Sequence, residues 1–273
     1  MSSGSAARPV KRQFVDGRFG QIHVRTAVPA EPSERPLLCL HMSPKSGRQF
    51  MHFMAAMASD RVVVAPDYPG YGESAPPPAE PHVTIEDYAQ SVIEVIDALD
   101  LGPVDLLGFH TGAEVAAALA DRAPARVRRI VMVSAPVLTN EELTAFNALY
   151  APIELDLDGT RFRKQWESVV KHRGPGMTLT MMAESFAEGL RGGEGYEWGH
   201  RAAFAYAPRY PDVVASLSQR VVVLNPHDDL AHITPRIEPY LNNGELVDKP
   251  DWGHGFFDAH TDDAVATIRQ ALA

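Results

Sequence analysis

The sequence has one cysteine, no membrane-length apolar run and fewer basic than acidic residues, and each shortage excludes a class of protein. A single cysteine, Cys39, cannot form an intramolecular disulfide, and the apolar run 37–40 around it indicates a buried, reduced thiol. Thirty-five acidic against 25 basic side chains give a formal net charge of −10, which repels phosphates, so we expect no nucleic-acid partner. Even the apolar segment 104–120 contains Asp, His and Glu side chains, so we expect no membrane span and no membrane partner.

The first twelve residues, MSSGSAARPVKR, are small, polar and basic, and they lack the apolar block of a secretory signal. They indicate a flexible tail and a cytoplasmic protein. The chain has no internal repeat, and its one low-complexity tract is the turn cluster 76–81. These patterns do not specify the oligomeric state, which could be a monomer or a homo-oligomer.

Forty-five per cent of the 273 residues are hydrophobic, which is enough for one sizeable core, so we expect one large domain. Short continuous aliphatic runs recur along the chain, as is typical of strands that are buried on both faces. The segments between them, such as 85–99 and 112–122, have helical composition and length. The sequence therefore predicts an α/β protein with a mainly parallel central sheet flanked by helices, whose strands include residues 37–40, 62–65, 104–107, 130–133 and 221–224.

Two segments depart from this alternation. Residues 13–16 and 21–27 flank a glycine-bounded turn and predict an antiparallel hairpin at a sheet edge. A later segment has no convincing strand and carries Met, Trp, His and Gly-rich stretches, so we interpret it as a mostly helical insertion. The predicted organisation is a flexible tail (1–12), a core domain in two segments (13–135 and 220–273) and a helical insertion (136–219).

The most informative segment is 104–114, VDLLGFHTGAE, which runs from a predicted strand through a sharp turn into an Ala-rich helix. Such a turn needs small residues two positions on either side of its apex, because its backbone is strained and the helix packs close against the strand. Gly108 and Gly112 supply that room around His110. The layout is that of a nucleophile elbow, whose apex side chain is aimed into the cleft.

This elbow resembles the GxSxG motif of the α/β-hydrolase superfamily, and four further motifs occur in the order that the family requires. Residues 40–44 (LHMSP) resemble its HGxP oxyanion loop, and residues 67–74 (DYPGYGES) match its DxxGxGxS turn. Residues 225–229 (NPHDD) stand where the family keeps its acid, and residues 253–256 (GHGF) resemble the loop of its catalytic histidine. The resemblance spans residues 11–273 and implies the α/β-hydrolase fold, with the insertion at the place of the family's cap domain.

Two residues depart from the family pattern. The elbow apex is His110 instead of Ser, Cys or Asp, and Met42 stands where the oxyanion loop usually has Gly. Neither Thr111 nor Ser43 is a natural replacement for the missing nucleophile, but their backbone N–H groups could still form an oxyanion hole. The resemblance gives His41 mainly the role of organising the oxyanion loop.

The other members of a catalytic triad are present. The resemblance implies His254 as general base and an aspartate that accepts its other N–H. We prefer Asp228 over Asp229 as this acid, because its distance from the strand end matches the family pattern, and Asp229 would then cap the following turn. With the carboxylate behind His254, too few ligands would remain for an ion, so we expect no metal and no other cofactor.

A histidine at the elbow allows three mechanisms, given in order of preference. His254 and His110 together activate a water for direct attack, His110 itself attacks to give an acyl-imidazole, or the pair moves protons in a non-hydrolytic reaction. The first prediction is therefore a hydrolase of a small ester, lactone, amide or activated C–C bond. The alternatives are a cofactor-free lyase, isomerase or oxygenase that uses the same dyad, and a non-catalytic ligand-binding protein.

Aromatic and Met side chains of the insertion, among them Trp166 and Trp198, could form a lid that contacts the substrate. Packing within the lid is the more common role of such residues. A lid of this composition favours a small, largely apolar substrate.

Overall fold

The computed structural model describes residues 8–78 and 83–273, and its strands form one eight-stranded sheet. The strand order is β1-β2-β4-β3-β5-β6-β7-β8. The β1–β2 and β2–β4 pairs are antiparallel, and all other neighbouring pairs are parallel. The strands are β1 (Lys11–Gly17), β2 (Gly20–Ala27), β3 (Leu37–Leu40), β4 (Val63–Pro66), β5 (Val104–Phe109), β6 (Val127–Val133), β7 (Arg220–Pro226) and β8 (Gly244–Lys249).

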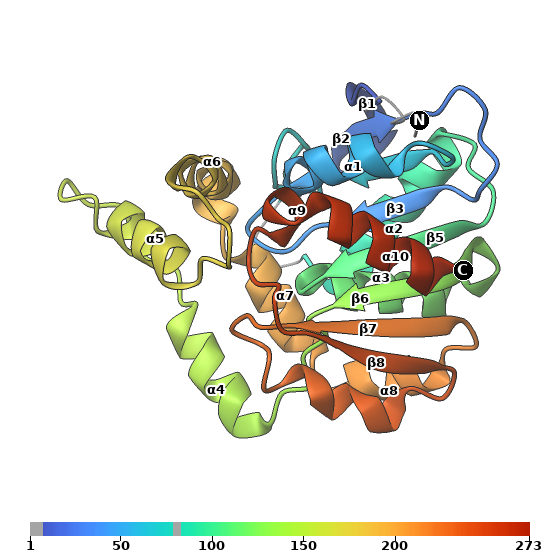
Figure 1. Cartoon of the computed structure of the whole chain (residues 1–273). Helices are drawn as coiled ribbons and strands as arrows, with labels where there is room; N and C mark the ends of the chain where they lie inside the picture. The colour runs from blue at the N-terminus through green and yellow to red at the C-terminus, as the bar shows by residue number, and fades with distance from the viewer. Residues whose placement is uncertain (1–7, 79–82) are drawn as a thin grey trace.

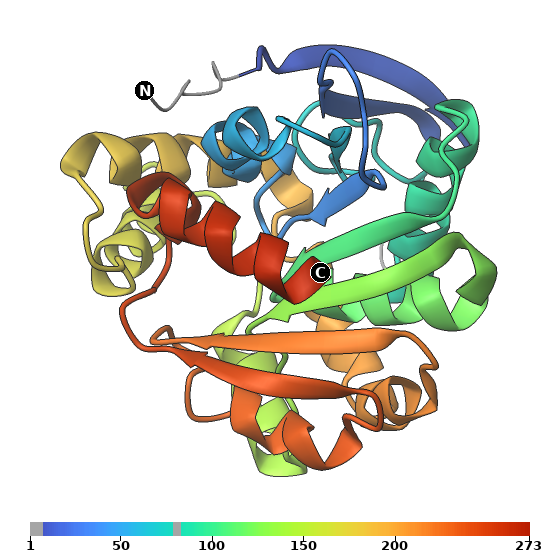
Figure 2. The same ribbon diagram turned by 45° about the vertical axis from the view of Figure 1, so that its right-hand side comes forward.

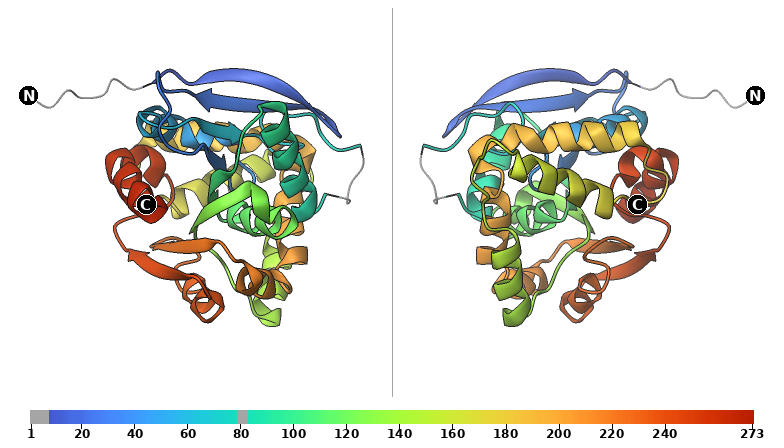
Figure 3. Two further views of the ribbon diagram at one scale, coloured as in Figure 1. Left: turned by 90° about the vertical axis from the view of Figure 1, so that its right-hand side faces the viewer. Right: turned by 90° about the vertical axis from the view of Figure 1, so that its left-hand side faces the viewer.

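The five predicted strands and the predicted hairpin are confirmed. Each aliphatic run overlaps one of the strands β3 to β7, and every residue of β3 and β4 is buried. Figure 3 shows the β1–β2 hairpin along one side of the molecule, opposite β7 and β8. The sequence did not reveal β8, because its residues are exposed or half-buried at the outer edge and form no continuous apolar run.

Helices cover both faces of the sheet, and each face has its own apolar core. Helices α1, α9 and α10 pack on one face, and α2, α3 and α8 pack on the other (Figures 1 and 2). Because side chains alternate along a strand, Leu106 of β5 belongs to one core and Leu107 to the other. The helices are α1 (Met51–Met57), α2 (Ile85–Ala98), α3 (Thr111–Arg122), α4 (Asn140–Leu149), α5 (Thr160–Lys171), α6 (Leu179–Gly189), α7 (Trp198–Tyr206), α8 (Tyr210–Ser216), α9 (Phe256–Ala259) and α10 (Thr261–Leu272).

The segment 136–219, between β6 and β7, contains five of these helices and no strand. Helices α4, α5 and α6 project from one end of the sheet, on the left of Figure 1. Helices α7 and α8 instead contact α3 and so belong to the layer on that face of the sheet. The predicted insertion is therefore helical, but its last two helices pack as part of the core.

The predicted tail of residues 1–12 is too long, because Lys11 and Arg12 already pair with β2. Residues 1–7 of that tail, and residues 79–81 of the predicted turn cluster, lie outside the described residues. Cys39 is fully buried, as expected, and burial raises the pKa of its thiol. No helix in the described part of the chain is long and apolar enough to cross a membrane.

Candidate functional site

The sharp turn between β5 and α3 places His110 at its apex. The backbone of His110 has φ 50° and ψ −116°, a conformation that side-chain-bearing residues rarely adopt. A Cβ atom added to Gly108 would lie 2.2 Å from the carbonyl oxygen of Gly112, and one added to Gly112 would lie 2.0 Å from that of Leu40. The two glycines are therefore required by close backbone packing, as the motif predicts.

Four side chains from three loops meet at this apex. His110 comes from the elbow, Asp228 and Asp229 follow β7, and His254 precedes α9. One possible ligand atom from each of these side chains lies within 4.8 Å of those from the other three. The ring centroids of the two histidines are 5.2 Å apart. We call these four side chains the His–Asp cluster.

Each histidine of the cluster has its own carboxylate. His110 Nε2 lies 2.9 Å from Asp228 Oδ2, and His254 Nε2 lies 2.6 Å from Asp229 Oδ1. The predicted pairing of Asp228 with His254 is therefore wrong: Asp229 holds His254, and Asp228 holds the elbow histidine. The predicted capping of the following turn by Asp229 is also wrong, because Asp228 accepts the hydrogen bond from the Leu230 N–H.

The orientation of Asp228 explains this difference. Its Oδ1 accepts the Leu230 N–H at 2.9 Å, and its Oδ2 accepts the Ser134 hydroxyl at 2.5 Å. Ser134 directly follows β6 and has a positive φ of 57°. These two donors hold the Asp228 carboxylate over the elbow. Sequence reasoning missed Ser134, although its place after the strand next to β5 was a usable signal.

The carboxylates control the charge of the cluster. Burial by itself lowers the pKa of His110, but the nearby charge and hydrogen bond of Asp228 outweigh burial, and the net pKa is raised. Burial opposes ionisation of Asp228 and Asp229, yet the two histidines lower the pKa of both carboxyl groups. The side chains of His110 and His254 are 12% and 17% exposed, so the site is shielded but reachable.

The loop after β3 supports the elbow from the other side. His41 is fully buried, with its Nε2 accepting the Tyr68 N–H at 3.0 Å, so its Nδ1–H donates to the Met42 carbonyl at 2.8 Å. Burial lowers the pKa of His41 to about 4, which keeps the ring neutral. The Met42 N–H donates to Gln49 Oε1 at 3.3 Å. His41 thus fixes the path of this loop through backbone groups.

The two expected oxyanion donors belong to buried residues. Ser43 is 1% exposed, and Thr111, the first residue of α3, is 5% exposed. Among the described residues, neither backbone N–H has a hydrogen-bond acceptor within the protein.

A third imidazole reaches the cluster from the insertion. His172, which ends α5, is stacked on His254 with ring centroids 6.0 Å apart and planes 20° apart. The neighbouring Gly174 N–H donates to the His254 carbonyl at 3.1 Å. Burial is the main cause of the lowered pKa of His172. Nothing in the sequence marked His172, because the contact depends on how the insertion folds back.

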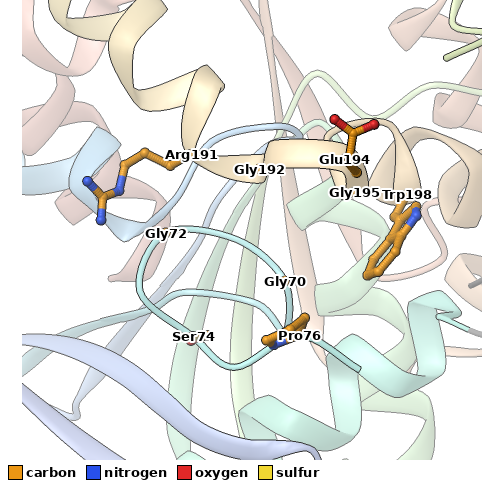
Figure 4. Close-up of a pocket in the computed structure, with 9 residues that line it drawn as sticks. All are labelled: Gly70, Gly72, Ser74, Pro76, Arg191, Gly192, Glu194, Gly195 and Trp198. Atoms are coloured by element: carbon orange, nitrogen blue, oxygen red, sulfur yellow. The ribbon is translucent and has the colours of Figure 1, made fainter. Parts of the chain in front are cut away.

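The two predicted tryptophans of the insertion have separate surroundings. Trp166 packs edge-to-face on Phe186, between α5 and α6. Trp198 lines a cavity of about 340 Å³ between the loop after β4 and the 3-10 helix η3 (Leu190–Gly195), opposite Gly70 and Pro76 (Figure 4). No residue of the cluster lines this cavity.

Known proteins show the same fold. A family model for the alpha/beta hydrolase fold matches residues 35–160, which include the elbow but not the two aspartates or His254. An esterase from Exiguobacterium antarcticum superimposes with a TM-score of 0.78 over 96% of this chain and 100% of its own, at 17% sequence identity. Likeness at this level of identity shows the fold alone.

Two sequence relatives match part of the chain. A 2-hydroxymuconate semialdehyde hydrolase from a Pseudomonas strain is 31% identical over 144 residues, which is 50% of each protein. A 2-hydroxy-6-oxo-2,4-heptadienoate hydrolase from Pseudomonas putida is 33% identical over 97 residues, or 36% of this chain and 35% of the relative. The match thus spans half or less of these relatives. The chain has the α/β-hydrolase fold, and the turn between β5 and α3 carries the imidazole of His110.

Proposed function

We propose that the protein hydrolyses a small, largely apolar ester, lactone, amide or activated C–C bond by direct attack of water at the His–Asp cluster. The observation that supports this best is the pairing of two facing imidazoles with separate carboxylates at the elbow of an α/β-hydrolase fold. The apex carries no hydroxyl, thiol or carboxylate, and the Nε2 of His110 is bonded to Asp228, so in this proposal water is the attacking group.

In this proposal, His254 is the general base. Asp229 bonds its Nε2 and stabilises the imidazolium that forms when the ring takes a proton from water. The water oxygen forms a bond to the acyl carbon, and the carbonyl oxygen takes up the electron pair. The backbone N–H groups of Ser43 and Thr111 hold that oxygen.

His110 is the complementary general acid. Because Asp228 raises its pKa, His110 carries the proton that the leaving group needs when its bond to the acyl carbon breaks. The proton on His254 then returns to His110 through solvent. The net reaction adds OH to the acyl fragment and H to the leaving group. Because water attacks the acyl carbon directly, no covalent intermediate forms on the protein.

The matched relatives suggest where a substrate search begins. They are named for the hydrolysis of 2-hydroxymuconate semialdehyde and of 2-hydroxy-6-oxo-2,4-heptadienoate. We propose small unsaturated oxo-acids of this kind, together with p-nitrophenyl esters and lactones, as the first panel.

The test measures turnover of this panel in ¹⁸O-labelled water by wild type, His254→Ala and a control, His52→Ala. His52 forms an exposed pair with Asp258 and has no part in the proposed chemistry. We expect one ¹⁸O atom in the acyl product, a loss of about 10²- to 10⁴-fold in kcat/KM for His254→Ala, and no loss for the control. Turnover without ¹⁸O in the product, or full activity of His254→Ala, would refute the proposal.

A further inference from the structure

The His–Asp cluster contains two carboxylates, one more than a catalytic triad uses. A triad needs one carboxylate behind one imidazole, whereas here each of two imidazoles has its own aspartate. Among the described residues, this is also the one group of three or more His, Cys, Asp or Glu side chains whose ligand atoms come together. Other His–Asp or His–Glu contacts, such as His52 with Asp258 and His200 with Glu197, are single pairs.

The spacing of the four groups is close to that of a single ion site. Four ligands at 2.0 to 2.2 Å around one tetrahedral ion lie about 3.3 to 3.6 Å apart, and the four atoms here lie within 4.8 Å of one another. Side-chain rotations that bring the most widely spaced atoms about 1 Å closer would complete the site. The residues come from three loops at one edge of the sheet.

The donor set selects a class of metal. Two imidazole nitrogens and two carboxylate oxygens suit first-row divalent transition metals, whereas calcium and magnesium sites are built from oxygen alone. Two aspartates carry two negative charges, which one divalent ion neutralises while both imidazoles stay neutral. The ion would thus take the place of the two protons now held between the histidines and aspartates.

The surroundings of the cluster also fit a metal site. Ser134 and the Leu230 N–H fix both oxygens of Asp228, as outer hydrogen bonds commonly fix carboxylate ligands. The elbow backbone fixes His110. The partial exposure of His254 and Asp229, 17% and 25%, leaves a direction open for water and substrate.

We propose that His110, Asp228, Asp229 and His254 bind one divalent transition-metal ion, such as Zn²⁺, Mn²⁺ or Fe²⁺, with an open position for water. The inference rests on the proposed hydrolysis and replaces the proton-transfer roles of His110 and His254: as ion ligands both rings would be neutral, and the attacking water would supply the proton that the leaving group takes up. A bound ion would lower the pKa of its water and supply hydroxide near neutral pH. The acyl carbon, the leaving group and the oxyanion donors remain as described.

The test uses the full chain, freed of any affinity tag and stripped with a chelator. Stripped protein is titrated with Co²⁺, followed by its visible absorption, and with Zn²⁺, followed by metal analysis after desalting. We expect about one ion per chain and a Co²⁺ spectrum typical of nitrogen and oxygen ligands.

Variants assign the ligands. His110→Ala, Asp228→Asn, Asp229→Asn and His254→Ala should each lose the Co²⁺ spectrum, Ser134→Ala should bind about 10- to 100-fold more weakly, and His52→Ala should bind as wild type. Circular dichroism confirms that each variant is folded, and His110→Cys, which keeps a metal ligand, should retain the ion with a shifted spectrum.

The outcomes separate the metal from the reaction. Stripped protein that binds no ion, or ligand variants that bind as tightly as wild type, would overturn the metal inference even if hydrolysis is found. An ion bound by a protein that hydrolyses nothing in the panel would support the metal inference and contradict the proposed function alone.

Discussion

His41 and His110 follow neighbouring parallel strands at the same edge of the sheet, yet they are held in opposite ways. His41 bonds only to backbone groups, and burial lowers its pKa to about 4. His110 bonds to a carboxylate that raises its pKa in spite of burial. Burial alone therefore does not decide what an imidazole does, since the partner decides which protonation state is stable. The first is a neutral support for a loop, and the second belongs to the proposed chemistry.

The largest expected effect is the loss of either histidine of the cluster. His254→Ala and His110→Ala should each lower kcat/KM by about 10²- to 10⁴-fold, because each removes a proton-transfer group or an ion ligand. The double variant should lose little more than the worse single variant, since the two rings act as a unit. Kinetics of the three variants on one substrate measure this. Strictly additive losses would show that the rings act independently.

Replacing each aspartate by asparagine tests which histidine it is paired with. Asp228→Asn should weaken the hydrogen bond to His110 and lower its pKa, and Asp229→Asn should weaken the hydrogen bond to His254. NMR should show Asp228→Asn shifting the ring signals of His110 more than those of His254, and Asp229→Asn the reverse. If Asp228→Asn affected His254 more than His110, the pairing in the structure would be contradicted.

The third prediction concerns the stability contributed by His41. Its pKa is about 4 in the folded chain and near the ordinary 6.5 in the unfolded chain, so between these pH values the unfolded chain binds more protons. Stability should therefore be full above pH 6.5 and fall by up to about 1.4 kcal/mol per pH unit as the pH drops toward 4.

His41→Asn can keep a donor to the Met42 carbonyl without the titrating ring. Urea unfolding of wild type and variant at several pH values measures the difference. The curve of the variant should be flatter in this window. Parallel curves would mean that His41 does not carry the effect.

The smallest expected effect is a gain. His110→Ser restores the hydroxyl that the elbow usually carries, and His254 with Asp229 stands ready as its base. We expect slow labelling of this variant by a fluorophosphonate, detected as an added mass, and none of the wild type. Equal labelling of both proteins would show that another residue is the reactive one.

The sequence predicted the fold where packing imposes a pattern. Buried strands such as β3 and β5 need continuous apolar runs, and the elbow needs Gly108 and Gly112, so both leave a local trace. The outer strand β8 has no such pattern, because its residues are exposed or half-buried and do not need to be apolar. The motifs also located the four side chains of the cluster.

The partners within the cluster could not be read from the sequence. Whether Asp228 or Asp229 faces His254 depends on two donors that hold the Asp228 carboxylate at the elbow. One is the Ser134 hydroxyl after β6, and the other is the Leu230 N–H in the same loop as Asp228. The contact of His172 depends in the same way on the path of the insertion. Such contacts are set by tertiary structure, and no spacing encodes them.

The most direct test of the proposed function is a single turnover in ¹⁸O-labelled water with the protein in excess over substrate, followed by mass analysis of product and intact protein. Direct attack by water predicts one ¹⁸O atom in the acyl product of the first turnover and an unchanged protein mass throughout. An acyl adduct on the protein, or a first-turnover product whose oxygen comes from an aspartate, would contradict it.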